Sequence, residues 1–184
     1  MKIEKAIITE TSILIIMKSG VENLTVKNLA ANLNVEQTEL YKFFSKDEDI
    51  LVNVFREFEN ELKNFVLQSR KQNKNPASEL KFFFKNLYNL FLNKPYYLSI
   101  IFDKRLKKSD SRVNQSVKLM REMIENYLTE LINAGKHLNM FKTTISTKIL
   151  VNKILIEFKL LMKDEQLINE MIYELEILRK ANSL

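Results

Sequence analysis

The sequence contains no cysteine and no tryptophan, and only two glycines, two prolines and one histidine. Without cysteine it has no disulfide framework, thiol nucleophile or zinc–thiolate site. Sheet-rich folds need many turns built from glycine and proline, so their scarcity in 184 residues favours long helices with few connections. Apolar residues make up 46% of the chain, which is enough to give such helices a core.

Several functional signatures are also missing. No apolar run approaches the ~20 residues that span a bilayer, and Glu4 and Glu10 interrupt the apolar N-terminus where a signal peptide would need continuity. No glycine-rich phosphate loop, nucleophile motif or carboxylate–histidine metal cluster occurs, and His137 is expected in a solvated loop. We therefore expect a soluble cytoplasmic protein that is not an enzyme and has no catalytic residues, metal site or cofactor.

The net charge of +6 is unevenly distributed. Residues 1–50 carry six basic and eight acidic side chains, whereas the rest carries 23 basic and 15 acidic ones, with the basic excess densest between Lys63 and Lys108. Charge alone does not mark the N-terminal segment as a DNA-binding region.

The apolar periodicity predicts a first helix over residues 2–19, with Ile7, Leu14 and Met17 on one stripe. Gly20 follows this helix, and Gly135 is placed in the same way after a later one. Glycine adopts the left-handed conformation that ends a helix, so both are expected to be helix stops.

Two short helices follow. Thr25 is expected to cap the second, Asn34 to form a tight turn after it, and a third helix over residues 36–44 to bury Leu40 and Phe44. The inward-facing positions of the second helix are Val26, Leu29, Ala30 and Leu33.

The rest of the chain predicts longer helices. Ser45 offers a cap for a fourth helix, Pro76 begins a fifth, residues 96–102 form a sixth, and Asp110 or Ser111 caps a long helix to Ala134. Two further helices are expected over residues 144–163 and 165–180. The fold class is all-α with about nine helices, divided into a three-helix head (1–46) and a helical body (47–184).

Three helices in about 45 residues form the layout of a helix-turn-helix DNA-binding head. In it the second helix braces across the phosphate backbone and the third lies in the major groove. The segment resembles the tetracycline-repressor (TetR) family in Gly20 and in four short stretches that keep the family's register. These stretches are Asn23-Leu24-Thr25-Val26-Lys27-Asn28-Leu29-Ala30, Leu33-Asn34-Val35, Leu40-Tyr41-Lys42-Phe43-Phe44 and Glu48-Asp49-Ile50-Leu51.

The resemblance implies a transcriptional regulator, a repressor that binds double-stranded operator DNA as a homodimer and is released by a small, mostly apolar effector. By position, Thr25 and Lys27 would contact phosphate, and Gln37 and Thr38 would reach base edges. Tyr41 would donate its hydroxyl to a phosphate, although it could instead be a core aromatic beside Leu40. The remaining DNA-contacting candidates are Glu36, Lys42 and Lys46.

Three acids depart from the family pattern. Glu36 stands where a small cap is usual, Glu39 adds a carboxylate to the reading helix, and Asp47 stands where a lysine usually precedes the acidic pair. The acidic excess over residues 1–50, six basic against eight acidic side chains, motivates an alternative, a TetR-fold protein with weakened DNA binding that acts as an interaction or ligand-binding module. A third hypothesis, a helical ligand-binding protein or enzyme with a coincidental motif, is disfavoured by the regularity of the motif.

The last two helices are apolar over more than one face, which indicates a second partner. The resemblance implies that they pair with a second copy, although burial inside the monomer is the alternative. The interface candidates are Ile154, Leu155, Phe158, Leu161, Met171, Leu175 and Leu178.

The fifth to seventh helices are rich in aromatic residues. These aromatic residues are either core or the lining of the effector cavity that the resemblance implies. The basic excess suggests an acidic group on that effector, unless the lysines are simply solvated. The pocket candidates are Phe84, Tyr88, Phe91, Tyr96, Tyr97 and Phe102.

Overall fold

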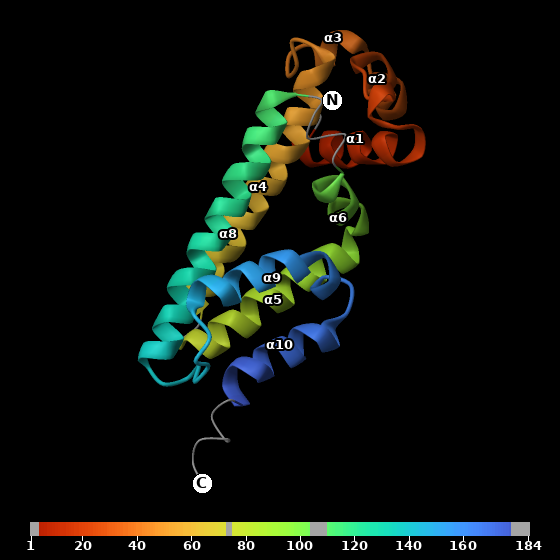
Figure 1. The fold of residues 1–184 in the computed structure, drawn as a ribbon. Helices are drawn as coiled ribbons and strands as arrows, with labels where there is room; N and C mark the ends of the chain where they lie inside the picture. Colours follow the sequence, from red (N-terminus) through yellow and green to blue (C-terminus); the bar gives the residue numbers. More distant parts are fainter. Residues whose placement is uncertain (1–3, 73–74, 104–109, 178–184) are drawn as a thin grey trace. The chain divides into compact units, whose positions relative to one another are not determined.

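The structure, a computed structural model, describes residues 4–72, 75–103 and 110–177. These residues form nine α-helices, one short 3-10 helix and no strand (Figure 1). The all-α fold class predicted from the scarcity of glycine and proline is confirmed. Among the described helices, none combines the length and hydrophobicity of a transmembrane span.

The chain divides into two compact units. Residues 1–61 and 100–119 form one, called the head unit here, and residues 62–99 and 120–184 form the other, called the body unit. Three helices contribute residues to both units: α4 (Asp47–Gln72), α6 (Pro95–Phe102) and α8 (Ser111–His137). The head unit therefore contains the start of α8, a segment far from the N-terminus in sequence.

The N-terminal part of the head unit consists of α1 (Lys5–Ser19), the 3-10 helix (Val21–Asn23), α2 (Val26–Leu33) and α3 (Gln37–Leu40). α2 packs against both α1 and α3. Its predicted inward positions are confirmed, with Leu33 half-buried and the other three buried. The buried side chains of this small core are Ile8, Ile13, Val26, Leu29, Ala30, Leu40 and Phe44.

α1 ends as predicted. Gly20 has φ 89° and ψ 162°, and its N–H donates to the carbonyl of Ile16 at 3.0 Å. The apolar stripe of α1, however, lies on its exposed side, where Ile7, Leu14 and Met17 are 48%, 59% and 55% exposed. Apolar residues occupy both sides of this helix, so its periodicity did not indicate which side faces the core. The side that is buried carries Ile8, Thr9, Ser12, Ile13 and Ile15.

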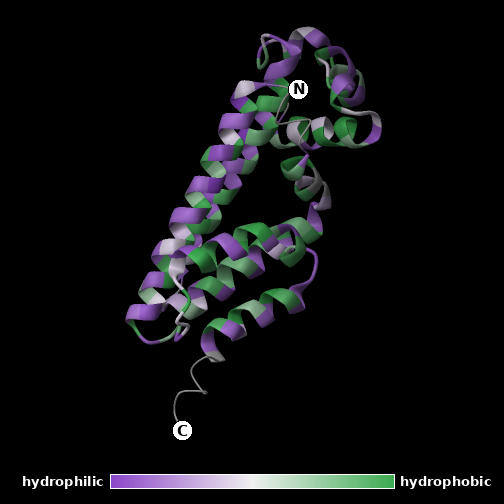
Figure 2. Cartoon of the chain, viewed as in Figure 1, coloured by the Kyte–Doolittle hydropathy of each residue, from purple (hydrophilic) through white to green (hydrophobic). Residues whose placement is uncertain are grey.

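In the body unit, α5 (Pro76–Asn93) begins at Pro76 as predicted, and the Asn75 side chain accepts the N–H of Ser78 at 2.9 Å. α10 (Glu165–Ile177) packs against α5 and against α9 (Thr147–Leu161). α4 and α8 alternate between hydrophilic and hydrophobic colouring along their length in Figure 2, as amphipathic helices do.

The prediction that Gly135 ends a helix is wrong. Gly135 is buried inside α8, which continues to His137, and the positive φ of 55° belongs to Asn139. The carbonyl of Gly135 accepts the N–H groups of Met140 (2.8 Å) and Phe141 (3.1 Å), so the chain folds back over it. A Cβ on Gly135 would lie 2.0 Å from Cδ2 of Phe141, so the glycine makes room for a buried ring. His137 is exposed, as expected, although it is helical rather than in a loop.

Candidate nucleic-acid interface

The turn between α2 and α3 has the geometry that the sequence predicted. The Thr25 hydroxyl accepts the N–H of Asn28 at 3.1 Å and caps α2. Asn34 is left-handed, with φ 54° and ψ 48°, and the N–H of Val35 donates to the carbonyl of Ala30 at 3.0 Å. The Thr25 cap therefore begins α2, and the left-handed Asn34 with the Val35 hydrogen bond fixes the end of α2 against the start of α3.

α3 is shorter than expected. It covers only Gln37–Leu40, and a turn replaces the predicted helix as far as Phe44. Leu40 and Phe44 are buried as predicted. Glu36 lies at the N-cap position with no side-chain capping hydrogen bond.

The residues expected to read DNA lie on the surface. Gln37 and Thr38 are exposed, and Tyr41 is 54% exposed. Tyr41 is therefore not a core aromatic, because Phe44 fills the core beside Leu40. These three side chains are free to meet a ligand, as base and phosphate contacts require.

Two of the three candidate lysines are paired with carboxylates. Lys42 Nζ lies 2.5 Å from Glu39 Oε1, and the hydrogen bond and charge of Lys42 lower the pKa of Glu39. Lys46 Nζ lies 3.9 Å from Glu48 Oε2. Lys27 is exposed at the first turn of α2.

Three consecutive acids, called the acidic turn here, begin α4: Asp47, Glu48 and Asp49. Negative charge at a helix N-terminus is favoured by the helix dipole, which was the expected explanation. The structure adds tertiary partners. Asp47 Oδ1 accepts the N–H of Val26, the first residue of α2, at 2.7 Å. This contact explains an acid where the motif usually has a lysine.

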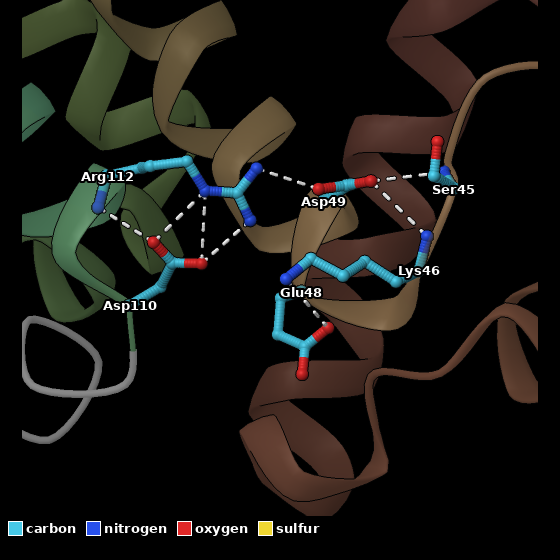
Figure 3. A network of polar contacts seen from close by, with 6 residues as sticks. All are labelled: Ser45, Lys46, Glu48, Asp49, Asp110 and Arg112. Atoms are coloured by element: carbon cyan, nitrogen blue, oxygen red, sulfur yellow. Dashed lines mark hydrogen bonds and ion pairs between the residues drawn. The ribbon is translucent and has the colours of Figure 1, made fainter.

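Asp49 lies at the centre of a polar network (Figure 3). One of its carboxylate oxygens accepts the N–H groups of Ser45 (3.0 Å) and Lys46 (3.3 Å), and the other accepts Arg112 Nη1 at 2.8 Å. Arg112 also donates its Nη2 to Asp110 Oδ2 at 2.8 Å. The segment that follows α3 is thereby tied to the start of α8, inside the head unit.

The hydrogen bonds of this network shift the pKa values of its members. Hydrogen bonding to Arg112 is the main cause of the lowered pKa of both Asp49 and Asp110, and both carboxylates raise the pKa of Arg112. Asp110 also accepts the N–H of Arg112 at 2.7 Å, so it caps α8 as predicted. Ser45, the expected cap of α4, lies two residues before that helix begins. Sequence reasoning did not find Arg112, because no local pattern links residues more than 60 positions apart.

The pocket candidates are largely core residues. Phe84, Phe91 and Tyr97 are buried, Tyr88 is half-buried, and the Phe91 ring stacks edge-on against Phe158 at 6.0 Å. Phe102, assigned to the head unit, is half-buried, and the Tyr96 side chain lies outside the described part. An effector site at these positions stays a prediction.

The interface candidates are also partly core. Ile154, Leu161 and Leu175 are buried within the monomer, and Leu178 lies outside the described residues. The other three are half-buried, namely Leu155, Phe158 and Met171. A shallow groove of about 150 Å³ runs between α9 and α10. The large apolar side chains that remain exposed on these two helices include Ile149, Ile156, Leu160 and Tyr173, at 57–71%.

No protein-family model matches the sequence, and no curated protein matches it. Solved structures do match over nearly the whole chain. A TetR-family regulator from Agrobacterium tumefaciens superposes with a TM-score of 0.79 at 10% identity, covering 94% of this chain and 97% of that one. The regulator FadR from Bacillus subtilis, in complex with stearoyl-CoA, gives 0.71 at 16% identity over 95% and 98%. AibR, in complex with isovaleryl coenzyme A and operator DNA, gives 0.71 at 15% identity over 94% and 97%.

The chain therefore has the fold of TetR-family transcriptional regulators, as the motif in its first 51 residues implied.

Proposed function

We propose that this protein is a TetR-type transcriptional repressor that binds operator DNA as a homodimer and is released by a small amphipathic effector. The observation that carries the proposal is the exposed trio Gln37, Thr38 and Tyr41. It lies on a short helix and turn that follow α2 after the left-handed Asn34. The shared fold supports the proposal, because the Agrobacterium tumefaciens protein and the Bacillus subtilis FadR that share it are transcriptional regulators.

Two residues of the exposed trio are expected to contact different parts of the DNA, because their side chains differ in chemistry. The Gln37 amide can pair with the two major-groove edge atoms of adenine, whereas the Tyr41 hydroxyl can donate to a phosphate. Gln37→Ala should relax preference at one base position by ~1–3 kcal/mol, while Tyr41→Phe should weaken all sequences alike.

The test begins with selection of fragments of the protein's own genome that the purified protein retains, followed by titration of an enriched fragment and a random duplex. Equal losses on both duplexes for both variants would contradict the division of labour. Failure to enrich any fragment at low salt would remove the DNA-binding proposal itself.

A homodimer formed through α9 and α10 fits their remaining apolar surface. Ile149, Ile156 and Leu160 follow one another along α9 at helical spacing, and Tyr173 is exposed on α10. The buried Ile154 and Leu161 would support this surface from within rather than touch the partner. Sedimentation as a monomer at micromolar concentration would contradict the dimer.

The effector is proposed to be an amphipathic acid such as an acyl-coenzyme A. Two neighbours of the same fold are in complex with acyl-CoA molecules, and residues 51–184 carry 23 basic against 15 acidic side chains. Two reading helices can meet one face of B-DNA only about 34–36 Å apart, so a small change in head spacing releases the operator. α4 and α8 contribute residues to both units, so an effector bound in the body unit is proposed to move the head through these helices.

Thermodynamic linkage determines what the effector experiment must measure. A ligand that weakens operator binding must itself bind the operator complex less tightly, by the same factor. A thermal-shift panel of acyl-CoAs and free amphipathic acids, followed by operator titration with each stabilising compound, measures both sides. Compounds that stabilise the protein but leave operator affinity unchanged would contradict induction.

One observation favours a second candidate, a TetR-fold protein that acts as a cytoplasmic interaction or ligand-binding module without enzymatic activity. The cations expected to face DNA at Lys42 and Lys46 are paired with Glu39 and Glu48. This candidate predicts a stabilising ligand in the thermal-shift panel together with no retained DNA.

A further inference from the structure

The contact between Asp47 and α2 uses a backbone group that an anion would otherwise bind. Val26 is the first residue of α2, and its N–H donates to Asp47 Oδ1 at 2.7 Å. The N–H of Asn28 is already taken by the Thr25 hydroxyl. Two of the N–H groups at the start of α2 are thus satisfied by the protein's own side chains.

The contact lies at the surface, beside a hollow of about 250 Å³. Asp47 is exposed, so its carboxylate reaches α2 from the solvent side. The hollow is lined by Thr25 and Asp47 together with three further carboxylates, those of Glu22, Glu48 and Asp110. A phosphate approaching the start of α2 from this hollow would meet negative charge before it met an N–H group.

We propose that Asp47 sets the DNA affinity of the head by holding the Val26 N–H that a DNA phosphate would otherwise accept. The inference rests on the proposed function, in which Thr25 and Lys27 contact phosphate at this helix. Carboxylate and phosphate compete for the same N–H and the same positive helix end. The carboxylate is tethered, so its effective concentration is high, and a phosphate binds fully only when Asp47 has left.

If Asp47 were only a stabilising cap, its removal would change the DNA affinity in the opposite direction. If Asp47 only orders α2, its removal loosens the head and lowers DNA affinity together with thermal stability. If Asp47 is also a competitor, its removal raises DNA affinity even though the stability falls. The two effects are therefore separable by measuring both quantities on the same variants.

The experiment compares Asp47→Asn, Asp47→Ala and the control Glu22→Gln on a short random-sequence duplex over a range of salt concentrations. Asp47→Asn and Glu22→Gln each remove one negative charge from the lining of the hollow, and the asparagine oxygen can still accept the Val26 N–H. These two variants should therefore tighten binding by a similar factor. Asp47→Ala removes the same charge but also frees the N–H, so it should tighten binding further than Asp47→Asn does.

Thermal unfolding of each variant establishes that the head is folded at the assay temperature. Asp47→Ser, whose side chain is shorter and suits a helix start, replaces Asp47→Ala if the alanine variant is unfolded. DNA binding by Asp47→Ala or Asp47→Ser that is no tighter than that of Asp47→Asn overturns the inference while the proposed function stands. If neither the unmodified protein nor any variant binds duplex at low salt, the proposed function and the inference both fail.

Discussion

Gly135 offers a sharp test of the packing, because two effects of one methyl group oppose each other there. In a helix interior alanine is favoured over glycine by about 0.8–1.0 kcal/mol. Gly135 is helical, so Gly135→Ala carries no backbone strain. A Cβ at this position would, however, lie 2.0 Å from Cδ2 and 2.2 Å from Cε2 of Phe141, a ring that is 2% exposed.

The steric clash at Gly135→Ala costs more free energy than the higher helix propensity of alanine returns. The N–H groups of Met140 and Phe141 are both held by the Gly135 carbonyl, so the returning chain cannot slide away from α8. Forcing an extra methyl into such a site costs about 1–3 kcal/mol beyond what propensity returns, and ejecting the ring costs more. For a chain of this size the melting temperature should fall by roughly 2–10 °C.

Circular dichroism melts of four proteins measure the effect: the unmodified chain, Gly135→Ala, Phe141→Ala and the double variant. With the ring removed, Gly135→Ala should become stabilising by about 1 kcal/mol, because only the propensity gain remains. The sign change is the diagnostic result. If Gly135→Ala raises the melting temperature of the otherwise unmodified chain, the packing of Phe141 over Gly135 is refuted.

Three further predictions concern hydrogen bonds, charge and assembly. Tyr127 is buried and its hydroxyl donates to Glu79 Oε1 at 3.0 Å, so Tyr127→Phe should lower the free energy of unfolding by about 1–2 kcal/mol in urea titrations. The lowered pKa of Asp49 stabilises the fold above the unfolded value of 3.8 and stops doing so as pH falls through the folded one. Asp49→Asn should therefore flatten the loss of stability below pH ~4 in melts across pH, and an unchanged acid limb would count against the network. Ile156→Glu, at a residue 71% exposed, should give monomers in sedimentation without lowering the melting temperature of the monomer, whereas Leu14→Glu on α1 should leave the dimer intact.

Local signals in the sequence predicted the head well. Thr25, Asn34 and Gly20 each act within a few residues of their own position, so their roles could be read without tertiary information. The length of α3 could not, because propensity does not show where Phe44 must turn inward to reach the core. The exposed stripe of α1 was misplaced for another reason, because apolar residues on both sides of this helix leave no unique inward face.

The structural features that the sequence did not predict depend on contacts between residues far apart in the chain. Gly135 looked like a helix stop because glycine suits that role, and only the position of Phe141 shows that space was what mattered. Arg112 joins Asp49 across 63 residues, and nothing in either neighbourhood indicates the pair. The residues of α9 that face outward could not be separated from the buried ones, because both kinds are large and apolar.

The charge of the head is better described by its pairs than by its sum. Four of the eight acids in residues 1–50 hold a cation or a backbone N–H, namely Glu39, Asp47, Glu48 and Asp49. Two of those partners are Lys42 and Lys46, and Lys27 has no ion pair among the described side chains. Pairs of opposite charge have short-ranged fields, so of the three lysines expected to face DNA only Lys27 remains to attract phosphate at a distance.

A head with few uncommitted cations should show operator binding that depends weakly on salt. If each head of a dimer neutralises one or two phosphates, the slope of log K against log salt should be about −2 to −4. Fluorescence anisotropy of a labelled operator across salt concentrations measures it. Glu39→Gln and Glu48→Gln release Lys42 and Lys46 respectively, so each should steepen the slope towards one more phosphate per head. A slope near about −8 for the unmodified protein would show that these lysines leave their carboxylates on DNA, and that the pairs do not limit binding.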